Sequence, residues 1–340
     1  MGDLMRKPLK FLMTMVVASL AAASTVSAAD KLEVPVATWG SPNHINISTF
    51  VGKLQELLAQ EDGGRISIKH FPSGQLAEDA DMPVAIPSGN VKFGWVTLNG
   101  WSGVTQDVKI ADAPAGLTMQ QLEKATDGQN GLKAVLDKQF RKKGTTLLAV
   151  TPLGPAVFVT NQPALSPSDF KGKKIRVFSE GLATLTQALG GAPVKLPFAD
   201  VYTALQRGTI DGAIVGFQGV ASQKMYEVVK YLLIPASFTG AGGYQGWAAN
   251  AAWWDGLAQA DRAILSKAIR EAELYSRQKI VEDRENLADF YRGKDMTVVE
   301  LTPDMPEYAQ WVAVTKPLME TAEKELSAEI LAPIRAVQGK

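Results

Sequence analysis

Two periodicities of apolar residues alternate along the chain from residue 31 onward. Short runs that alternate apolar and polar residues, or that are continuously apolar, predict strands, whereas apolar residues at every third or fourth position predict helices. The predicted strands span residues 32–38, 66–71, 91–98, 145–151, 156–160, 174–178, 194–196, 210–215, 247–251 and 296–301. The predicted helices span residues 43–60, a short segment from 75, 120–142, 184–189, 198–206, 222–231, 260–291 and the region from 308. This alternation predicts an α/β fold with mostly parallel sheet.

The segment 260–291 differs from the other predicted helices in its length. It keeps a helical pattern for more than 30 residues without glycine or proline, whereas an average helix has about 11–12 residues. No strict heptad runs through it, which argues against a coiled coil. A chain of 340 residues can form two lobes, and we expect this helix to lie across both of them.

The first 29 residues have the pattern of a secretory signal peptide. Arg6, Lys7 and Lys10 precede an apolar run over 11–23, and small residues at 26–29 offer a cleavage site after Ala28 or Ala29. A membrane anchor is the alternative, but the apolar run is shorter than the roughly 20 residues that span a bilayer. We therefore expect export and cleavage.

The charge of the chain favours a soluble exported protein over a nucleic-acid binder. Lys and Arg number 35, as do Asp and Glu. Without residues 1–29, which hold three basic residues and one acidic residue, the net charge is about −2. No basic block is present that could neutralise phosphates. Because the sequence has no cysteine for a lipid anchor, we expect the protein in the periplasm of a two-membrane bacterium.

The sequence lacks the residue patterns that most enzymes and metalloproteins need. It has no cysteine and only two histidines, His44 and His70, which stand far apart and in no metal-binding motif. Neither a phosphate-binding Gly-rich loop with Lys-Ser/Thr nor a nucleophile elbow occurs. The sequence thus predicts a protein that is not an enzyme and has no cofactor or metal.

Four tryptophans, Trp39, Trp95, Trp101 and Trp247, stand at or just beyond the ends of predicted strands. Ligands of open α/β sheets bind beyond the carboxyl ends of the strands, so these rings are candidates for contact with a ligand. Ordinary packing in the core is the alternative interpretation for each of them.

Three stretches of the second half carry a motif of a known family. They are Gly172-Lys173-Lys174-Ile175-Arg176-Val177, Ala188-Leu189-Gly190-Gly191-Ala192-Pro193-Val194, and the run from Pro197-Phe198 through Tyr202-Thr203-Ala204-Leu205-Gln206 to Ile210-Asp211-Gly212. In this order they closely resemble the solute-binding proteins of tripartite ATP-independent periplasmic (TRAP) transporters, of the DctP-like family. The resemblance covers nearly the whole chain after residue 29. It implies a two-lobed periplasmic binding protein, type II-like, with a long interlobe helix.

The resemblance also implies a binding site for a small organic anion. Arg176 matches the family's ligand-binding arginine, and a guanidinium there can hold a carboxylate through two parallel hydrogen bonds. Phe198 matches a position that packs on the ligand. The other candidates for contact with the ligand are Trp39, Thr97, Asn99, Phe178, Phe217, Gln218 and Trp247.

Two positions depart from the family pattern. Val215 stands where many members have an asparagine that binds the carboxylate, and Ala156 lies in the region where receptors for acidic sugars have a second arginine. With one clear cation, the site predicts a ligand that has one acid group and a largely uncharged body. A second carboxylate would be buried without a partner, at high cost.

The predicted function is a periplasmic receptor that captures a small organic anion and delivers it to the small and large membrane subunits of a TRAP transporter. We expect a monomer with lobe I over 30–153 and 240–280, lobe II over 154–239 and 281–340, and hinges near 152–155 and 236–243. Two alternatives remain, a binding protein for another carrier or a sensor, and a secreted α/β enzyme.

Overall fold

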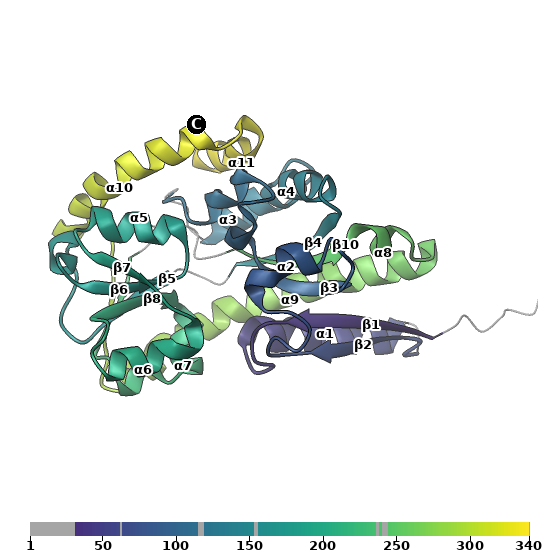
Figure 1. Cartoon of the computed structure of the whole chain (residues 1–340), viewed down its shortest axis with the longest axis horizontal. Helices are drawn as coiled ribbons and strands as arrows, with labels where there is room; N and C mark the ends of the chain where they lie inside the picture. The colour runs from purple at the N-terminus through teal and green to yellow at the C-terminus, as the bar shows by residue number, and fades with distance from the viewer. Residues whose placement is uncertain are drawn as a thin grey trace, which may run out of the picture. The chain divides into compact units, whose positions relative to one another are not determined.

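Two β-sheets form the framework of the protein (Figure 1). A computed structural model describes residues 31–61, 63–114, 119–152, 156–235, 238–239 and 244–339. The first sheet has the order β2-β1-β3-β10-β4. Its strands are β1 (Leu32–Thr38), β2 (Ile66–Phe71), β3 (Phe93–Thr97), β4 (Thr145–Pro152) and β10 (Tyr244–Asn250).

The second sheet has the order β11-β9-β5-β8-β6-β7. Its strands are β5 (Ala156–Thr160), β6 (Lys174–Val177), β7 (Ala192–Lys195), β8 (Gly212–Gly216), β9 (Tyr231–Ile234) and β11 (Thr297–Glu300). Each sheet combines parallel pairs, such as β1 with β2 and β6 with β7, with antiparallel pairs made by β10 and β5. The chain is therefore a mixed α/β protein, which confirms the predicted fold class.

Helices and short turns connect the strands. The α-helices are α1 (Ile45–Glu61), α2 (Met82–Ala85), α3 (Met119–Thr126), α4 (Leu132–Arg141), α5 (Glu180–Ala188), α6 (Val201–Gln206), α7 (Phe217–Ser222), α8 (Ala251–Asp255), α9 (Gln259–Arg292), α10 (Pro306–Glu325) and α11 (Ala328–Gln338). The 3₁₀ turns are η1 (Asp79–Asp81), η2 (Leu98–Trp101), η3 (Gln106–Ala111), η4 (Pro167–Phe170), η5 (Phe198–Asp200) and η6 (Met225–Glu227).

Each sheet separates two apolar clusters. In the first sheet, α1 and α9 bury one cluster with residues such as Phe50 and Ile269, and α4 and α11 bury the other with Leu136 and Ile330. The second sheet likewise has one cluster around Trp311 and another that includes residues of α6 and α7. Burial on both faces explains the continuously apolar strands, since such strands lie between two layers.

Helix α9 is 34 residues long and contacts elements of both sheets. It packs against α1 and β4 in the first lobe and against β11 and α7 in the second, and Figure 1 shows it extending from one sheet to the other. This confirms the long helix that the sequence predicts between the lobes.

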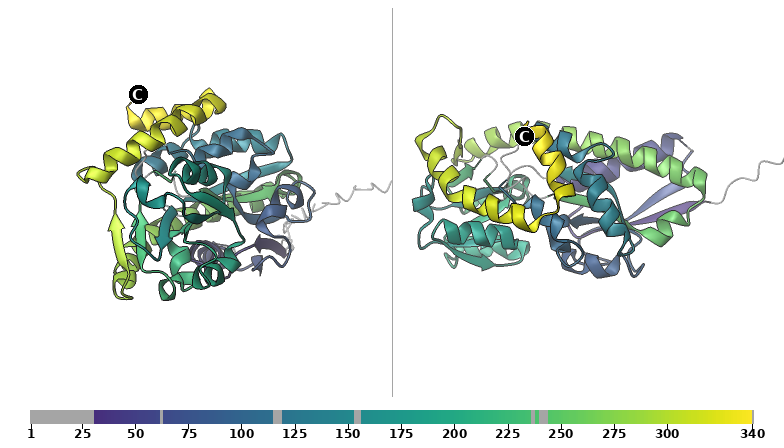
Figure 2. Two further views of the ribbon diagram at one scale, coloured as in Figure 1. Left: turned by 60° about the vertical axis from the view of Figure 1, so that its left-hand side comes forward. Right: turned by 90° about the horizontal axis from the view of Figure 1, so that it is seen from above.

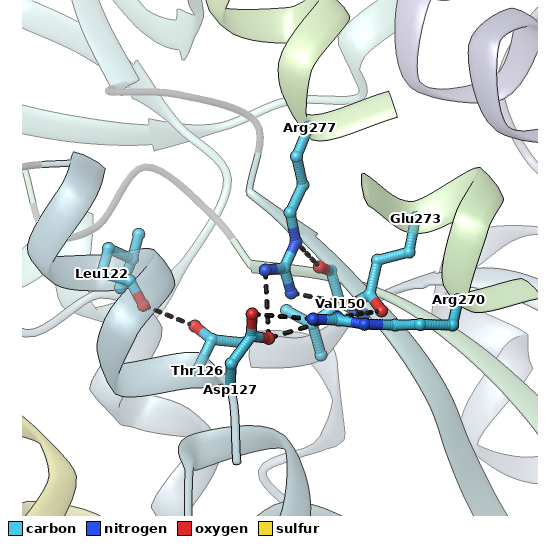
Figure 3. Close-up of polar contacts among 7 residues, drawn as sticks. All are labelled: Leu122, Thr126, Asp127, Val150, Arg270, Glu273 and Arg277. Carbon is cyan, nitrogen blue, oxygen red and sulfur yellow. Dashed lines mark hydrogen bonds and ion pairs between the residues drawn. The ribbon is translucent and has the colours of Figure 1, made fainter. Parts of the chain in front are cut away.

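A buried ionic network fixes α9 to the edge of the first sheet (Figure 3). Glu273, fully buried, accepts hydrogen bonds from the Val150 amide at 2.8 Å and from Arg277 and Arg270 at 2.7 and 2.6 Å. Arg277 donates to the Val150 carbonyl at 2.9 Å, and both arginines also reach Asp127. The network therefore holds β4 at Val150, two residues before the segment 152–155 in which the sequence predicts a hinge.

The last helix joins a different lobe from the one expected. The sequence assigns all of 281–340 to lobe II, whereas α11 packs against α3 and α4 of the first lobe. Ile330, Leu331 and Ile334 are buried in the same apolar cluster as Leu132 and Leu136 of α4. Figure 2 shows the two C-terminal helices in yellow passing over both lobes. The other lobe boundaries stay predictions.

Two predicted helices also differ from the structure. The helix expected over 120–142 is divided at Gly128 and Gly131, where Gly128 has a φ of 90°, a conformation that favours glycine. The helix expected over 222–231 does not form: α7 ends at Ser222, and Lys224 adopts a left-handed φ of 52° before the 3₁₀ turn η6. Strand β9 then begins at Tyr231. The predicted hinges at 152–155 and 236–243 fall almost entirely outside the described residues.

Candidate functional site

Arg176 is held rigidly in the middle of the second sheet. It lies on β6 between β8 and β7, and it is 5% exposed. Its Nε donates to the carbonyl of Leu196 at 3.0 Å, and its Nη1 donates to the carbonyl of Ile214 at 3.2 Å. A guanidinium has five N–H groups, so three remain, distributed over Nη1 and Nη2. This edge of the guanidinium can receive the two oxygens of one carboxylate.

Among the described residues, no carboxylate pairs with Arg176. One other arginine of the described residues, Arg277, is buried to the same degree, and it pairs with Glu273 and Asp127. Burial lowers the pKa of Arg176 to about 10, because a charged group loses hydration in the protein interior. An anion bound at Arg176 would offset this cost, so the residue has the properties of an anion-binding group.

Two phenylalanines lie beside the guanidinium. The ring centroids of Phe178 and Phe198 are 5.6 and 5.9 Å from the central carbon of Arg176. Phe198 begins η5 directly after Pro197 and packs over α7, where a Cβ on Gly219 would lie 3.0 Å from the ring. The structure thus brings together three of the residues that the sequence predicts, Arg176, Phe178 and Phe198.

Gln218 is the second polar candidate in this lobe. It lies in the first turn of α7, two residues after β8 ends, and it is 6% exposed. Its Oε1 is buried without a hydrogen-bond donor in the described part of the chain. The next residue of α7, Gly219, lies against the ring of Phe198.

Phe217 and Trp247 pack in the apolar core, in contrast to their predicted contact with a ligand. Phe217 is fully buried against Tyr291, with ring planes at 80°, and the Tyr291 hydroxyl donates to the Phe217 carbonyl. Trp247 is fully buried and stacks on Phe50 with ring centroids 3.9 Å apart. Both positions follow a strand or lie within one, and the sequence pattern does not show which face of the sheet a ring covers.

Trp39 lies over the aromatic cluster of the first lobe. Its ring stacks on Trp95 with centroids 4.5 Å apart and planes at 15°, and it is only partly buried. The indole N–H groups of Trp39, Trp95 and Trp247 are buried without an acceptor among the described residues. Trp39 therefore remains a candidate for ligand contact, supported from behind by Trp95.

Thr97 and Asn99 follow one another at the end of β3. The Thr97 hydroxyl donates to Gln245 at 3.2 Å, and its amide donates to Asp79 at 3.0 Å. The side-chain Nδ2 of Asn99 donates to Asp112 at 3.0 Å. Burial raises the pKa of both Asp79 and Asp112 to about 6, because an ionised carboxylate is disfavoured in an apolar environment.

The structure buries one polar residue, Asn46, that the sequence did not indicate as a candidate. Both side-chain polar atoms of Asn46, at the start of α1, lack partners among the described residues although the residue is fully buried. His44 accepts a hydrogen bond from the Asn46 amide, and burial lowers its pKa to about 4. The position of Asn46 after the first strand is the one signal that could have indicated it, since ligands bind near such strand ends.

One hollow of the first lobe is not part of this site. A pocket of about 440 Å³ opens beside the Asp127 network, and none of the predicted ligand residues lines it. The structure also shows no cluster of three or more His, Asp or Glu residues suited to a metal ion, within the residues that it describes.

A buried, unpaired arginine between aromatic rings, on a two-sheet framework crossed by a long helix, is characteristic of a receptor for small anions. A sequence model of bacterial extracellular solute-binding proteins, family 7 (DctP), matches residues 36–325. The chain therefore belongs to this family, the solute-binding proteins of TRAP transporters.

Individual relatives agree with this assignment. The C4-dicarboxylate-binding periplasmic protein DctP of Rhodobacter capsulatus is 31% identical over 84% of both chains. The 2,3-diketo-L-gulonate-binding periplasmic protein YiaO of Escherichia coli is 28% identical over 84% of this chain and 86% of its own length. The crystal structure of a TRAP periplasmic solute-binding protein from Shewanella oneidensis with bound succinate superimposes with a TM-score of 0.81. It shares 26% identity and covers 90% of this chain and 99% of its own.

These comparisons confirm the predicted family and the two-lobed fold. The family consists of solute-binding receptors, and its members from Rhodobacter capsulatus and Shewanella loihica are periplasmic binding proteins. In the part of the chain that the structure describes, no helix has the length and apolar character to cross a membrane.

Proposed function

We propose that this receptor captures an organic acid with one carboxylate and a largely uncharged body in the periplasm, and delivers it to the two membrane subunits of a TRAP transporter. The observation that carries this proposal is Arg176, a buried cation with three free N–H groups and no carboxylate partner within the described residues. The carboxylate of the ligand would complete its hydrogen bonds and balance its charge.

Two positions support a single acid group. Val215 and Ala156, where the family resemblance leads us to expect a polar and a cationic side chain, are both fully buried apolar residues. Phe178 and Phe198 flank the guanidinium and offer apolar surface to the rest of the ligand. A second carboxylate would lose its hydration beside these groups without gaining a cation.

A compact dicarboxylate is the second candidate, and two of the relatives favour it. The Rhodobacter relative is a C4-dicarboxylate-binding protein, and the Shewanella structure holds succinate. The Escherichia coli relative binds 2,3-diketo-L-gulonate by its name. The relatives therefore divide between the two candidates, and a binding experiment is required to distinguish them.

The test is a thermal-shift screen of the mature protein against mono- and dicarboxylates, followed by calorimetry. A ligand at 100 times its dissociation constant stabilises the protein by about 2.7 kcal/mol. We expect a monoacid to bind more tightly than malate, succinate or fumarate. Submicromolar binding of one of these dicarboxylates, with no tighter monoacid, would contradict the proposal.

The variant Arg176→Lys tests the anchor itself. An ammonium cannot form the planar pair of hydrogen bonds, and loss of a buried charged partner costs about 2–5 kcal/mol. We expect affinity to fall by at least about 30-fold, with a thermal midpoint near that of the wild type. Arg292→Lys, on the exposed end of α9 and paired with Asp289, is the matched control and should bind normally. Turnover of the bound acid would instead support a secreted enzyme.

A further inference from the structure

The side-chain amide of Asn99 has a defined orientation. Its Nδ2 donates to Oδ1 of Asp112 at 3.0 Å, and an ionised carboxylate is only an acceptor. The pKa of Asp112, raised by burial to about 6, still leaves it ionised at neutral pH. The amide oxygen Oδ1 of Asn99 is therefore the group that points elsewhere, and it is buried without a donor among the described residues.

Asp112 also connects Asn99 to the lobe that carries Arg176. The carboxylate of Asp112 accepts hydrogen bonds from the Ser179 hydroxyl and from the amide of Gly181, at the start of α5. Only a glycine permits this approach, because a Cβ on residue 181 would lie 2.5 Å from the Cβ of Asp112. Ser179 follows directly on Phe178, whose ring is beside the Arg176 guanidinium. The contacts of Asn99 thus lead through Asp112 to Ser179, the residue next to Phe178 in the chain.

A buried acceptor without a donor is costly, so its presence needs an explanation. Leaving such a group unsatisfied costs about 1–3 kcal/mol, and buried polar groups in native proteins are nearly always paired. Asp112 holds the amide so that it cannot turn to satisfy its oxygen within the protein. A ligand that brings an O–H or N–H group to this oxygen would remove the cost.

We infer that Asn99, positioned by Asp112, is a specificity-determining residue that accepts a hydrogen bond from a hydroxyl or N–H group on the bound acid. The inference rests on the proposed function, in which Arg176 binds the carboxylate. It narrows the ligand class to hydroxy acids, sugar acids and acids with an N–H group. It also gives a second reason against a dicarboxylate without a hydroxyl or N–H group, such as succinate, since an ionised carboxylate offers no donor to the Asn99 oxygen.

The inference is tested with pairs of acids that differ in one donor. The pairs are lactate and propionate, 2-hydroxyisobutyrate and isobutyrate, pyroglutamate and its lactone analogue 5-oxotetrahydrofuran-2-carboxylate, and malate and succinate. Dissociation constants are measured by calorimetry on the mature wild-type protein and on Asn99→Ala, Asp112→Asn and a control, Asp169→Asn. Asp169 also accepts hydrogen bonds from backbone amides, those of Leu165 and Ser166, but contacts neither Asn99 nor Arg176.

For a pair of acids that binds to the wild type, we expect the acid with the donor to bind at least about 10-fold more tightly than the acid without it. A site built to bind a donor rejects analogues that lack the donor. The ratio should fall to within about 3-fold in Asn99→Ala, because the acceptor is gone. In Asp112→Asn the amide loses its fixed orientation, so the ratio should decrease while the affinity for the donor-free acid changes little. A purely structural role of Asp112 would weaken both acids equally. Asp169→Asn should keep the wild-type ratio.

Other outcomes separate the two proposals. Arg176-dependent binding with a ratio near one, or a ratio that persists in Asn99→Ala, would overturn the role of Asn99 and leave the proposed function standing. If none of the acids binds, or binding does not depend on Arg176, the proposed function and this inference both fail. If Asp112→Asn does not fold, the comparison of wild type with Asn99→Ala decides the question alone.

Discussion

Glu273 joins the long helix α9 to strand β4 through a buried ionic network, and its replacement by glutamine tests what this network contributes to stability. The substitution keeps the shape of the side chain and one oxygen. That oxygen can still accept from the Val150 amide and from Arg277, as Oε1 does at 2.8 and 2.7 Å. At the other position, an NH₂ group would replace the oxygen that accepts from Arg270 at 2.6 Å, so two donors would face each other.

The expected loss of stability follows from the burial of the network. Glu273 is 0% exposed and Arg277 is 4% exposed, and removing one charge from a buried pair costs about 3–5 kcal/mol. Asp127 continues to bind both arginines, which favours the lower end of this range. We therefore expect Glu273→Gln to lower the free energy of unfolding by about 3 kcal/mol, which corresponds to a decrease in Tm of about 6 °C.

The assay is urea denaturation of the mature protein, followed by circular dichroism and tryptophan fluorescence. Glu282→Gln is the matched control on the same helix, because Glu282 pairs with Lys279 at the surface and such pairs contribute about 0–1 kcal/mol. If Glu273→Gln and Glu282→Gln destabilise the protein equally, the network does not anchor α9 in the way described.

Three further predictions concern other parts of the chain. His44, with a pKa of about 4 in the native state against an ordinary value of 6.5, contributes stability that is present above pH 6.5 and lost as the pH falls to 4. The stability difference between wild type and His44→Gln should therefore change by about 3 kcal/mol between these pH values, and parallel urea-denaturation profiles would contradict this. Gly219→Ala places a Cβ 3.0 Å from the Phe198 ring and should weaken acid binding, measured by calorimetry, several-fold. The control Gly216→Ala, whose Cβ meets no atom within 4 Å, should bind the acid normally. Equal affinities of the two variants would exclude a role for Phe198 in shaping the site. Mass spectrometry of the exported protein should find its first residue at 29 or 30, and retention of Met1 would show that no signal peptide is removed.

Periodicity predicted most of the framework because burial on two faces leaves a strong pattern in the sequence. Strands β1, β2 and β8 and the helix α9 all lie where the apolar residues indicate. Strand β9 was not predicted, because the apolar residues before it have helical spacing up to Tyr231 and the strand follows them without a break in the pattern. The helix breaks instead at Lys224, a residue whose left-handed conformation no composition rule indicates.

The site was predicted in part, and the missing part depends on contacts between distant segments. Arg176 and Phe198 were found from the family motif, and the structure places them together. The packing of Trp247 on Phe50 depends on which face of β10 the ring covers, and the local sequence does not encode this. No local sequence pattern indicated Asp112, because its role depends on two residues that are distant from it in the chain. Asn99 lies 13 residues before it, and Gly181 lies in the other lobe.

A crystal structure of the mature protein with the tightest acid from the binding screen tests the central claim most directly. The account predicts that both oxygens of one ligand carboxylate lie within hydrogen-bond distance of Nη1 and Nη2 of Arg176. Nε should still donate to Leu196 and Nη1 to Ile214, as it does in the structure described above. A ligand whose carboxylate binds elsewhere, with Arg176 still bonded only to these two carbonyl groups, would contradict it.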